Sequence, residues 1–517
     1  MEATVTHIHL TRPTKGQGPS LQTQLYNALM QQIVRGQLRP GLKLPAHREL
    51  AKELGVSRNT VVAVIDQLKV EGYLESRLGS GVFIKSVVPE QPLGSSIQAP
   101  TRETIQASIQ ETIQADTGWP AGHEIESTLG DYGQFLFNQV VPDNDANRPL
   151  TPGLPDVEAF PTQIWRRLLS RHGDRPNLLG YNGVQGYPPL RKAIADYLGS
   201  SRGVRCTPEQ IIITQGAQQA LSLCGQIFLN PGDSVLVENP GYTGAHKAFS
   251  QQGQNLLPLP LINHHLDTQF LMQQQSPEYQ QAKLLYTCPT HQYPMGGILP
   301  AQDRLNLLQW ARDHQTWIIE DDYDSEFHFY HRPIAAIQGM AANTPVIYMG
   351  SFSKTMFPGL RLGFLVVPKP LVDTFIRAKN FMTGESPLPI QATTADFIQE
   401  GHFSRHLRRM RNRYRVKWEL ARQLCQQHLG HLADTLAESA GMHLVVEIPD
   451  VDDKQLQRDL ASAGFGSSPL SKYFLPGAPS RTGLVLGFAC ANEAEIESGI
   501  LQVQQLCEAQ LAVKSAK

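Results

Sequence analysis

The chain has 517 residues, too many for one ordinary hydrophobic core, so two or more domains are expected. Charged residues make up 18% and apolar residues 41%, and no run of about 18 apolar residues occurs, so we expect a soluble protein with no membrane span. The six dispersed cysteines form no CxxC pair, and the N-terminus lacks the apolar run of a signal peptide. These features predict a cytoplasmic protein with no metal site.

Charge is distributed unevenly along the chain. Residues 20–88 hold nine lysines and arginines against five acidic residues, whereas residues 89–145 hold one against nine. A basic head beside an acidic spacer is typical of a small nucleic-acid module tethered to another domain. We therefore divide the chain into a head (residues 19–88), a flexible acidic linker (89–145) and a large domain (146–512). The linker repeats Thr-Ile-Gln-Ala at 104–107 and 112–115, with too few apolar residues for a core, which predicts a flexible or weakly helical tether.

Apolar spacing predicts three helices in the head. The first runs from Leu21 to Leu38, the second covers residues 47–54, and the third begins after the N-cap Ser57 and ends near Val70. Short strands at residues 73–77 and 81–84 enclose a turn at 78–80. The pattern is that of a helix-turn-helix followed by a β-wing.

The third helix opens with hydrogen-bonding side chains that can reach base edges in a major groove: Ser57, Arg58, Asn59 and Thr60. Arg48 on the second helix, with Arg77 and Ser80 on the wing, would contact phosphates. A polar helix start on a protein-interaction module would give the same local pattern.

A longer match favours DNA. The segments at 44–51 (LPAHRELA), 54–61 (LGVSRNTV), 71–74 (EGYL) and 77–83 (RLGSGVF) resemble the GntR class of winged helices. The resemblance implies binding to double-stranded DNA. Ala46 stands where that class usually has serine, which predicts the loss of one phosphate contact or helix cap.

Beyond residue 149, short β-rich runs alternate with helix-length segments. The runs are Ile211–Thr214, Ser234–Val237, Leu284–Tyr286, Trp317–Ile319 and Val346–Tyr348. This alternation predicts an α/β domain with a mainly parallel sheet covered by helices. A smaller α+β part with strands at 443–448 and 482–488 is expected at the C-terminal end.

The stretch from Gly350 to Gly363 combines an amine, hydroxyls and a guanidinium: Lys354, with Ser351 and Ser353 before it and Arg361 after it. Pyridoxal phosphate chemistry needs these groups, because the amine forms a Schiff base while the others hold the phosphate.

Four further segments agree with such a pocket. A helix opens after a strand at Gly216, Ala217 and Gln218; Asp321 ends a strand; Tyr242 offers a flat ring; and Tyr181 is a further polar candidate. Taken singly, Asp321 with Asp322 could be a metal pair or a solvated turn, Tyr242 a core residue and Gly216 a plain helix start. The five elements in this order are hard to explain otherwise.

The order resembles fold-type I aminotransferases from about residue 149 to the end. The resemblance implies that Lys354 is the Schiff-base lysine, Asp321 the partner of the pyridine nitrogen and Tyr323 a partner of the ring hydroxyl. It also implies that Tyr242 stacks on the ring and that Tyr181 reaches the phosphate of a neighbouring subunit, hence a homodimer. The phosphate cup would consist of Gly216, Ala217, Gln218, Ser351, Ser353 and Arg361.

One departure narrows the family. Aminotransferases usually carry Asn-Pro-x-Gly where this chain has Tyr293-Pro294-Met295-Gly296, and His291 or Gln292 could replace the lost asparagine. The HQYP and EDDYDSEF segments are similar to MocR/GabR regulators, in which a GntR head is fused to an aminotransferase-like body. For an effector carboxylate the candidates are Arg481 and Lys472, and the sequence does not decide between them. The basic run at 405–417 is read as a solvated helical face in preference to a second DNA surface.

The resemblance implies a transcriptional regulator that contains pyridoxal phosphate. An amine or amino-acid effector would react with the cofactor in the aminotransferase-like domain and so modulate DNA binding. Two alternatives stay open: an active aminotransferase that carries a DNA-binding head, and a regulator that senses pyridoxal phosphate itself. Turnover as an enzyme is the less favoured role, and the effector, the operator and the sign of regulation are not indicated.

Overall fold

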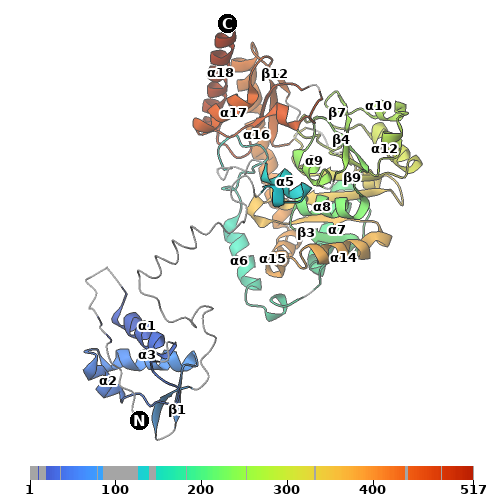
Figure 1. The fold of residues 1–517 in the computed structure, drawn as a ribbon. Coiled ribbons are helices and arrows are strands. Elements are labelled where there is room, and N and C mark those ends of the chain that lie inside the picture. The colour runs from blue at the N-terminus through green and yellow to red at the C-terminus, as the bar shows by residue number, and fades with distance from the viewer. Residues whose placement is uncertain are drawn as a thin grey trace. The chain divides into compact units, whose positions relative to one another are not determined.

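The computed structural model describes most of the chain: residues 8, 10, 19–34, 37–77, 80–85, 126–138, 147–181, 183–251, 253–330, 334–436, 441–478 and 480–515. It divides into two compact units: residues 1–125, which include the head, and residues 126–517, called here the body (Figure 1). Within the described ranges, no helix has the length and apolar character needed to cross a membrane.

The head contains three helices and a two-stranded wing, as predicted. Leu25 and Leu29 of the first helix pack with Val61, Val64 and Leu68 of the third, all fully buried. The wing strands are antiparallel, and their register runs from Leu74 opposite Ile84 to Arg77 opposite Gly81. The elements are α1 (Leu21–Val34), α2 (His47–Glu53), α3 (Arg58–Val70), β1 (Leu74–Arg77) and β2 (Gly81–Ile84). The described first helix is thus shorter than predicted, and turn residues 78 and 79 lie outside the described residues.

A seven-stranded sheet forms the centre of the body. Its strand order is β3-β11-β10-β9-β8-β4-β5, and only β11 runs antiparallel to its neighbours, so the prediction of a mainly parallel sheet is confirmed. The strands are β3 (Ile211–Thr214), β4 (Ser234–Glu238), β5 (Asn255–Leu259), β8 (Leu284–Thr287), β9 (Trp317–Asp322), β10 (Val346–Ser351) and β11 (Gly363–Val366). Sequence periodicity missed the edge strand β5 and the antiparallel β11.

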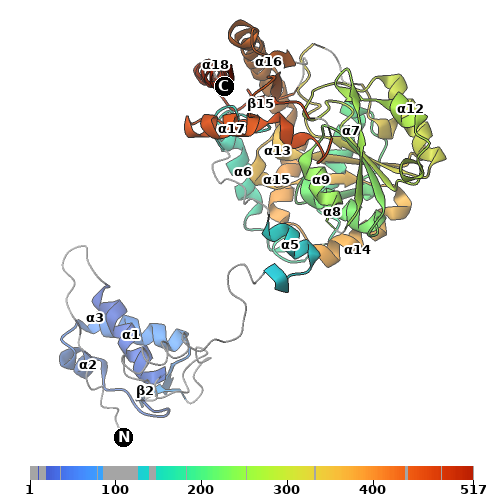
Figure 2. The same ribbon diagram turned by 45° about the horizontal axis from the view of Figure 1, so that its top comes forward.

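Helices cover both faces of this sheet (Figures 1 and 2). Successive strand residues alternate between the two faces: Ile212 packs with α8, whereas Ile211 and Ile213 pack with α7. One face carries α8 (Ala217–Phe228), α9 (Thr243–Phe249) and α14 (Val372–Met382), and the other carries α7 (Pro188–Arg202) and α12 (Ala301–Asp313). Because a parallel sheet buried on both faces needs apolar side chains on both, its strands read as continuous apolar runs in the sequence.

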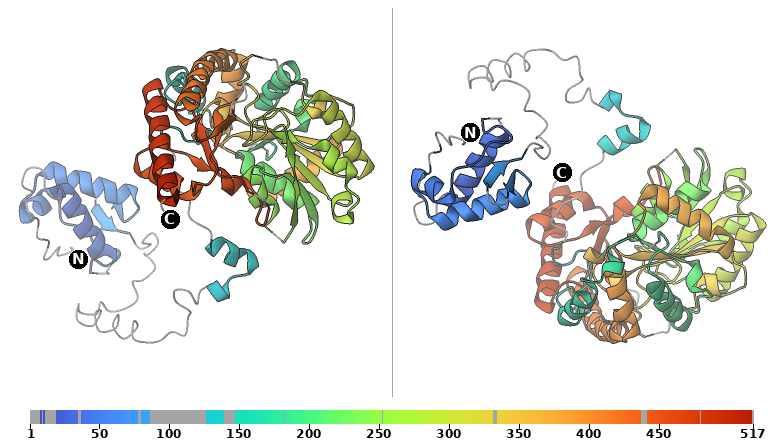
Figure 3. Two further views of the ribbon diagram at one scale, coloured as in Figure 1. Left: turned by 90° about the horizontal axis from the view of Figure 1, so that it is seen from above. Right: turned by 90° about the horizontal axis from the view of Figure 1, so that it is seen from below.

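The smaller α+β part includes the long helix α16 (His402–Leu429) and gathers on one side of the large sheet (Figure 3). Its antiparallel sheet has the order β12-β13-β15-β14. Its other elements are α15 (Leu388–Gln399), β12 (Asp434–Leu436), β13 (His443–Glu447), α17 (Asp453–Ser462), β14 (Ser468–Pro469), β15 (Gly483–Gly487) and α18 (Glu493–Ser515). The two strands predicted at 443–448 and 482–488 are β13 and β15.

Most of the expected linker, residues 89–125 and 139–145, lies outside the described residues, including both copies of the repeat. The described part between them contains the short helix α5 (Asp131–Phe137).

The shorter helices of the body are α6 (Thr162–His172), α10 (Thr268–Gln273), α11 (Pro277–Gln280) and α13 (Phe352–Thr355), and a small hairpin pairs β6 (Leu261–Ile262) with β7 (His265–Leu266).

Candidate functional site

A cavity of about 240 Å³ opens where the parallel strands of the large sheet end. Asp321 at the end of β9 and Ser351 at the end of β10 reach it from neighbouring strands, because the carboxyl ends of parallel strands lie at one edge. Nine of the eleven predicted cofactor residues line it: Ala217, Gln218, Tyr242, Asp321, Tyr323, Ser351, Ser353, Lys354 and Arg361.

Lys354 lies in the short helix α13, directly after β10. Ser351 caps this helix by accepting a hydrogen bond from the Ser353 amide. The side chain of Lys354 is half-buried, and its amine donates to the Gly153 carbonyl at 2.7 Å. Burial lowers the pKa of Lys354, although Asp324 and Asp321 act to raise it. A lowered pKa increases the fraction of free amine, the form that attacks an aldehyde.

The backbone at Gly216 and the guanidinium of Arg361 form an anion-binding corner. Gly216 precedes α8 with a φ of +89°, a region that favours glycine, and frees the first amides of that helix. Arg361 donates to the Gln215 carbonyl at 3.2 Å, and its Nη2 atom lies 3.5 Å from where a Cβ of residue 216 would stand. Helix amides, a guanidinium and the nearby hydroxyls of Ser351 and Ser353 suit a phosphate.

Asp321 is a buried carboxylate. Tyr286 donates its hydroxyl to the Asp321 carboxylate at 2.6 Å. Burial raises the pKa of Asp321 to about 7. A cation placed against this carboxylate would restore its ionised form, so the site suits a protonated ring nitrogen. Tyr242 lines the same cavity, and its hydroxyl accepts from Gln218 Nε2 at 3.3 Å.

His291 and Gln292 were the candidates to replace the asparagine that aminotransferases carry before Pro294, and neither lines the cavity. The Tyr323 hydroxyl lies 2.8 Å from Nδ1 of His291, and the same nitrogen lies 3.0 Å from the Asp324 carboxylate. His291 therefore stands behind Tyr323 and not among the residues that line the cavity. Gln292 faces elsewhere: it donates to the Pro240 carbonyl at 2.9 Å and to buried Glu238 at 3.2 Å, which holds the loop in place.

Sequence reasoning gave no role to several lining residues. They are Pro152, Gly153, Tyr286, Cys288, Tyr293, Asp324, Pro358, Met442 and His443. Most come from segments far from the recognised motifs, and His443 opens β13 of the smaller part. Asp324 belongs to the EDDYDSEF segment that was recognised in the sequence. Its spacing of two residues from Asp322 was the signal that could have identified it as a site residue.

Tyr181 does not line this cavity. Its side chain is 98% exposed in the single chain, which leaves its predicted contact with a neighbouring subunit a prediction.

The two candidates for an effector carboxylate also lie outside the lining. Arg481 is half exposed and forms an ion pair with Glu447 at 2.6 Å, and the Lys472 amine lies 5.2 Å from the ring centre of Tyr473.

The basic run on α16 is not a plainly solvated face. Lys417 is buried and bonds to Asp156 at 3.0 Å, and Arg413 bonds to the same carboxylate at 2.8 Å. Arg409 donates to the Ala159 carbonyl at 2.7 Å. The expectation of a solvated face was therefore wrong for Lys417, whereas Arg409 and Arg413 are exposed and also bond to the segment at 156–159.

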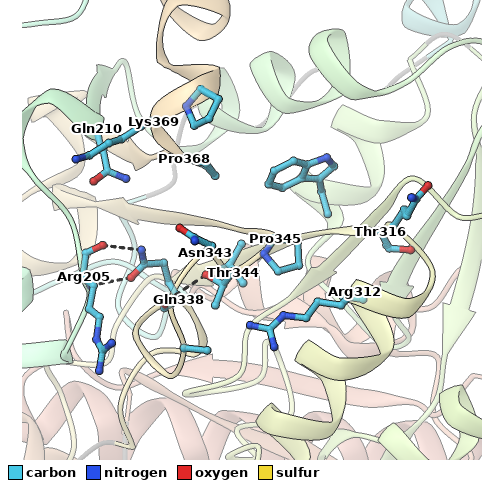
Figure 4. Close-up of a pocket in the computed structure, with 17 residues that line it drawn as sticks. Arg205, Gln210, Arg312, Thr316, Gln338, Asn343, Thr344, Pro345, Pro368 and Lys369 are labelled. Carbon is cyan, nitrogen blue, oxygen red and sulfur yellow. Dashed lines mark hydrogen bonds between the residues drawn. The ribbon is translucent and has the colours of Figure 1, made fainter.

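A second, larger cavity of about 860 Å³ lies around the amino ends of β9 and β10 (Figure 4). Gln338 closes part of it through two 2.8 Å hydrogen bonds to the backbone of Arg205. None of the predicted cofactor residues lines it. Ligand sites of α/β sheets form at the carboxyl ends of the strands, so the smaller cavity is the candidate site.

In the head, the predicted base-reading residues lie at the start of α3. Ser57 caps the helix by accepting from the Thr60 amide at 3.1 Å, which leaves the exposed side chains of Arg58 and Asn59 to project from its first turn. Ser80 and Arg48 are exposed.

Two details of the head bear on its predictions. Arg77 pairs with Glu75 at 2.8 Å and stacks over Phe83 at 4.5 Å, so a phosphate would have to compete for it. Ala46 begins α2 without a side-chain cap, and only the reverse contact from the Ala46 amide to Glu49 is made, at 3.3 Å. Helix α2 thus lacks a side-chain cap, which is one of the two losses expected from the sequence.

Two family models match the chain. Residues 21–84 match the gntR family of bacterial regulatory proteins, and residues 150–476 match aminotransferase class I and II. The chain is 38% identical to the probable rhizopine catabolism regulatory protein MocR of Rhizobium meliloti, covering 96% of this chain and 95% of that protein. It is 30% identical to the pyridoxine biosynthesis regulator PdxR of Corynebacterium glutamicum, covering 92% and 93%.

Among solved structures, the body is similar to LysN, an alpha-aminoadipate aminotransferase of Thermus thermophilus. The TM-score is 0.66 at 28% identity, over 75% of this chain and 98% of that one. That enzyme was solved with N-(5'-phosphopyridoxyl)-L-leucine. The predicted fold class, a winged helix joined to a fold-type I aminotransferase-like domain, is confirmed, and so is pyridoxal phosphate as the cofactor of this fold.

Proposed function

Because the chain belongs to the MocR-type transcriptional regulators, in which a GntR head precedes an aminotransferase class I and II body, we propose that an amine effector in the body modulates DNA binding by the head. The observation that supports the proposal is that one chain contains both a GntR head and an aminotransferase-like body. The same chain presents a capped recognition helix and a lysine in a cavity with a phosphate-type corner.

The cavity fits pyridoxal phosphate on four counts. Gly216 and Arg361 would hold the phosphate with Ala217, Gln218, Ser351 and Ser353; Asp321 would pair with the ring nitrogen; Tyr323 would bond the ring hydroxyl; and Tyr242 would stack on the ring. When bound, the cofactor supplies an aldehyde carbon that combines with primary amines. The fit rests on two features of the cavity: Asp321 is a buried carboxylate whose pKa burial raises to about 7, and hydrogen-bond donors gather at the corner beside Gly216.

The chain's own residues make the site responsive to amines. The Lys354 amine has a lowered pKa and is held by Gly153, so it competes with an incoming amine for one position. An effector amine that replaces the lysine amine frees the Lys354 side chain, and the contacts of the residues lining the cavity then change. Such a change regulates DNA binding only if the effector binds the two arrangements of the protein with different affinity.

A homodimer is part of the proposal. Tyr181, which is exposed in the single chain, would complete a partner's phosphate corner, and two heads would address two half-sites or direct repeats on double-stranded DNA. A predicted location in the cytoplasm accords with a partner of this kind.

The decisive experiment uses full-length protein loaded with pyridoxal phosphate. DNA affinity for the chain's own promoter region is measured with and without a panel of amines, for wild type, Lys354→Ala and the matched exposed-lysine control Lys369→Ala. We expect an amine-dependent shift of affinity in wild type and in the control, and none in Lys354→Ala. A full response in Lys354→Ala would refute the covalent form of the proposal.

A second function is favoured by the intact set of lysine, aspartate and phosphate corner and by the likeness to an aminotransferase. In that case the protein would convert an amino acid and a 2-oxo acid repeatedly, and Lys354→Ala would abolish the conversion. A third candidate, sensing of pyridoxal phosphate itself, would show DNA binding that depends on the cofactor and ignores every amine in the panel.

A further inference from the structure

The charges around the candidate cavity indicate what kind of amine it accepts. Among the described residues that line it, the cationic side chains are Lys354 and Arg361. Lys354 bonds to Gly153, at the position where amines compete. Arg361 belongs to the anion-binding corner with Gly216 and Gln215. Both cations are thus committed to the cofactor, and neither is left for an acidic group of an effector.

The rest of the polar lining is acidic or neutral. Asp321 and Asp324 are almost completely buried, with 6% and 2% of their surface exposed, and both stabilise the positive charge of Lys354. Burial lowers the pKa of His443 to about 3, so this imidazole is neutral at pH 7. An ammonium group is attracted to such a lining, whereas a carboxylate enters it without a partner.

Residues that pack behind the lining are small or apolar. On the wall strands β13 and β15, Val445 pairs with Val485, and the two are buried in a cluster with Met295 behind Tyr293, which lines the cavity. On α9, a side chain at Gly244 would overlap Gln218 and the ring of Tyr242. Packing therefore closes these positions to a longer side chain.

The two cations suggested by the sequence are held elsewhere. Arg481 is paired with Glu447 at 2.6 Å. Lys472 is exposed and lies over the ring of Tyr473. Each has a contact of its own, and neither lines the cavity.

We propose that the effector is a primary amine that carries no carboxylate, sulfonate or phosphonate group. This narrows the proposed function, on which it rests, from amines and amino acids together to amines whose other groups are uncharged or cationic.

The test compares matched pairs of compounds on the loaded, full-length protein. Each pair is an α-amino acid and its decarboxylated amine: alanine with ethylamine, serine with ethanolamine, lysine with cadaverine, histidine with histamine. The readout is the visible absorbance of the bound cofactor, and concentrations are compared as unprotonated amine, with free pyridoxal phosphate as the chemical reference. We expect the amine of a responding pair to half-saturate at a concentration about tenfold or more below that of its acid, because the carboxylate is buried unpaired.

Three variants sharpen the test. Arg481→Gln and Lys472→Gln should leave the ratio within each pair unchanged, whereas Asp324→Asn should reduce it by removing one repelling carboxylate. An acid that saturates at an equal or lower concentration than its amine, or that is weakened selectively by Arg481→Gln, overturns this inference and leaves the proposed function standing. A spectrum that no amine or amino acid changes overturns both.

Discussion

Two adjacent carboxylates at the end of β9 should respond in opposite ways to the same substitution. Asp321 is buried without a cation, and burial raises its pKa from 3.8 to about 7. Asp322 is equally buried, yet its pKa is lowered, because the ion pair with Arg202 at 2.6 Å outweighs the effect of burial. We expect Asp321→Asn to stabilise the cofactor-free protein at pH 8 and Asp322→Asn to destabilise it.

The magnitudes follow from the pKa values. The stability linked to Asp321 is fully present below pH 3.8 and is lost as the pH rises through about 7, a total of roughly 4 kcal/mol. About half of this loss falls between pH 5.5 and pH 8, so the advantage of Asp321→Asn should grow by about 2 kcal/mol over that interval. The Tyr286 hydroxyl can still donate to the asparagine oxygen. Asp322→Asn leaves Arg202 buried without its partner, which costs about 3–5 kcal/mol at both pH values.

The assay is denaturant unfolding of the cofactor-free, full-length protein, followed by tryptophan fluorescence at pH 5.5 and pH 8. Four of the five tryptophans lie in the body and none in residues 1–85, so the signal reports the body. Titrating groups that do not interact with Asp321 cancel in the difference between variants. A difference between Asp321→Asn and wild type that is the same at both pH values would refute the argument that burial controls this carboxylate. With pyridoxal phosphate bound the advantage should shrink, because the carboxylate then gains a cation.

Three further outcomes are expected. Arg58→Ala should weaken specific DNA binding by about 1–3 kcal/mol and relax the preference at one base pair, as measured by competition between operator variants in gel-shift assays; a uniform loss across all sequences would instead assign Arg58 to phosphate contact. Ala46→Ser should restore the missing cap of α2 and slow amide hydrogen exchange there about fivefold, corresponding to about 1 kcal/mol, and unchanged exchange would show that the cap does not form. Gly153→Ala should place a Cβ 2.6 Å from the Lys354 amine in a backbone region that favours glycine (φ +73°), and so slow formation of the visible cofactor band; unaltered loading kinetics would mean that Gly153 does not position the lysine.

The head could be predicted from local signals. The N-cap Ser57, the helical spacing of Val61, Val64 and Leu68, and the two wing strands each depend on residues close together in the sequence. The structure therefore agrees with the predicted elements, except that the described first helix ends at Val34. In the body, the strands buried on both faces were visible as apolar runs for the same reason.

The order of motifs around Lys354, Asp321 and Gly216 was also sufficient to predict the cofactor cavity. Each of these motifs ends a strand or begins a helix, and parallel strands deliver such ends to one edge of a sheet. Composition alone predicted neither the contacts of His291 and Gln292 nor the bonds by which cations of α16 hold the segment at 156–159. The direction of a side chain depends on the packing around it, and these residues meet partners that are distant in the sequence.

The sequence by itself determined which residues are candidates for the chemistry, because an amine, a carboxylate and phosphate donors are identifiable by type and spacing. Only the tertiary structure decided their environment. It showed Asp321 buried without a cation and Asp322 buried with one, although the two are neighbours in the chain. It also placed Arg481 and Lys472 outside the cavity lining and packed Val485 and Gly244 against side chains behind it. Burial and charge pairing are properties of surroundings assembled from distant segments, and for this reason the proposed class of effector rests on the fold and not on the motif.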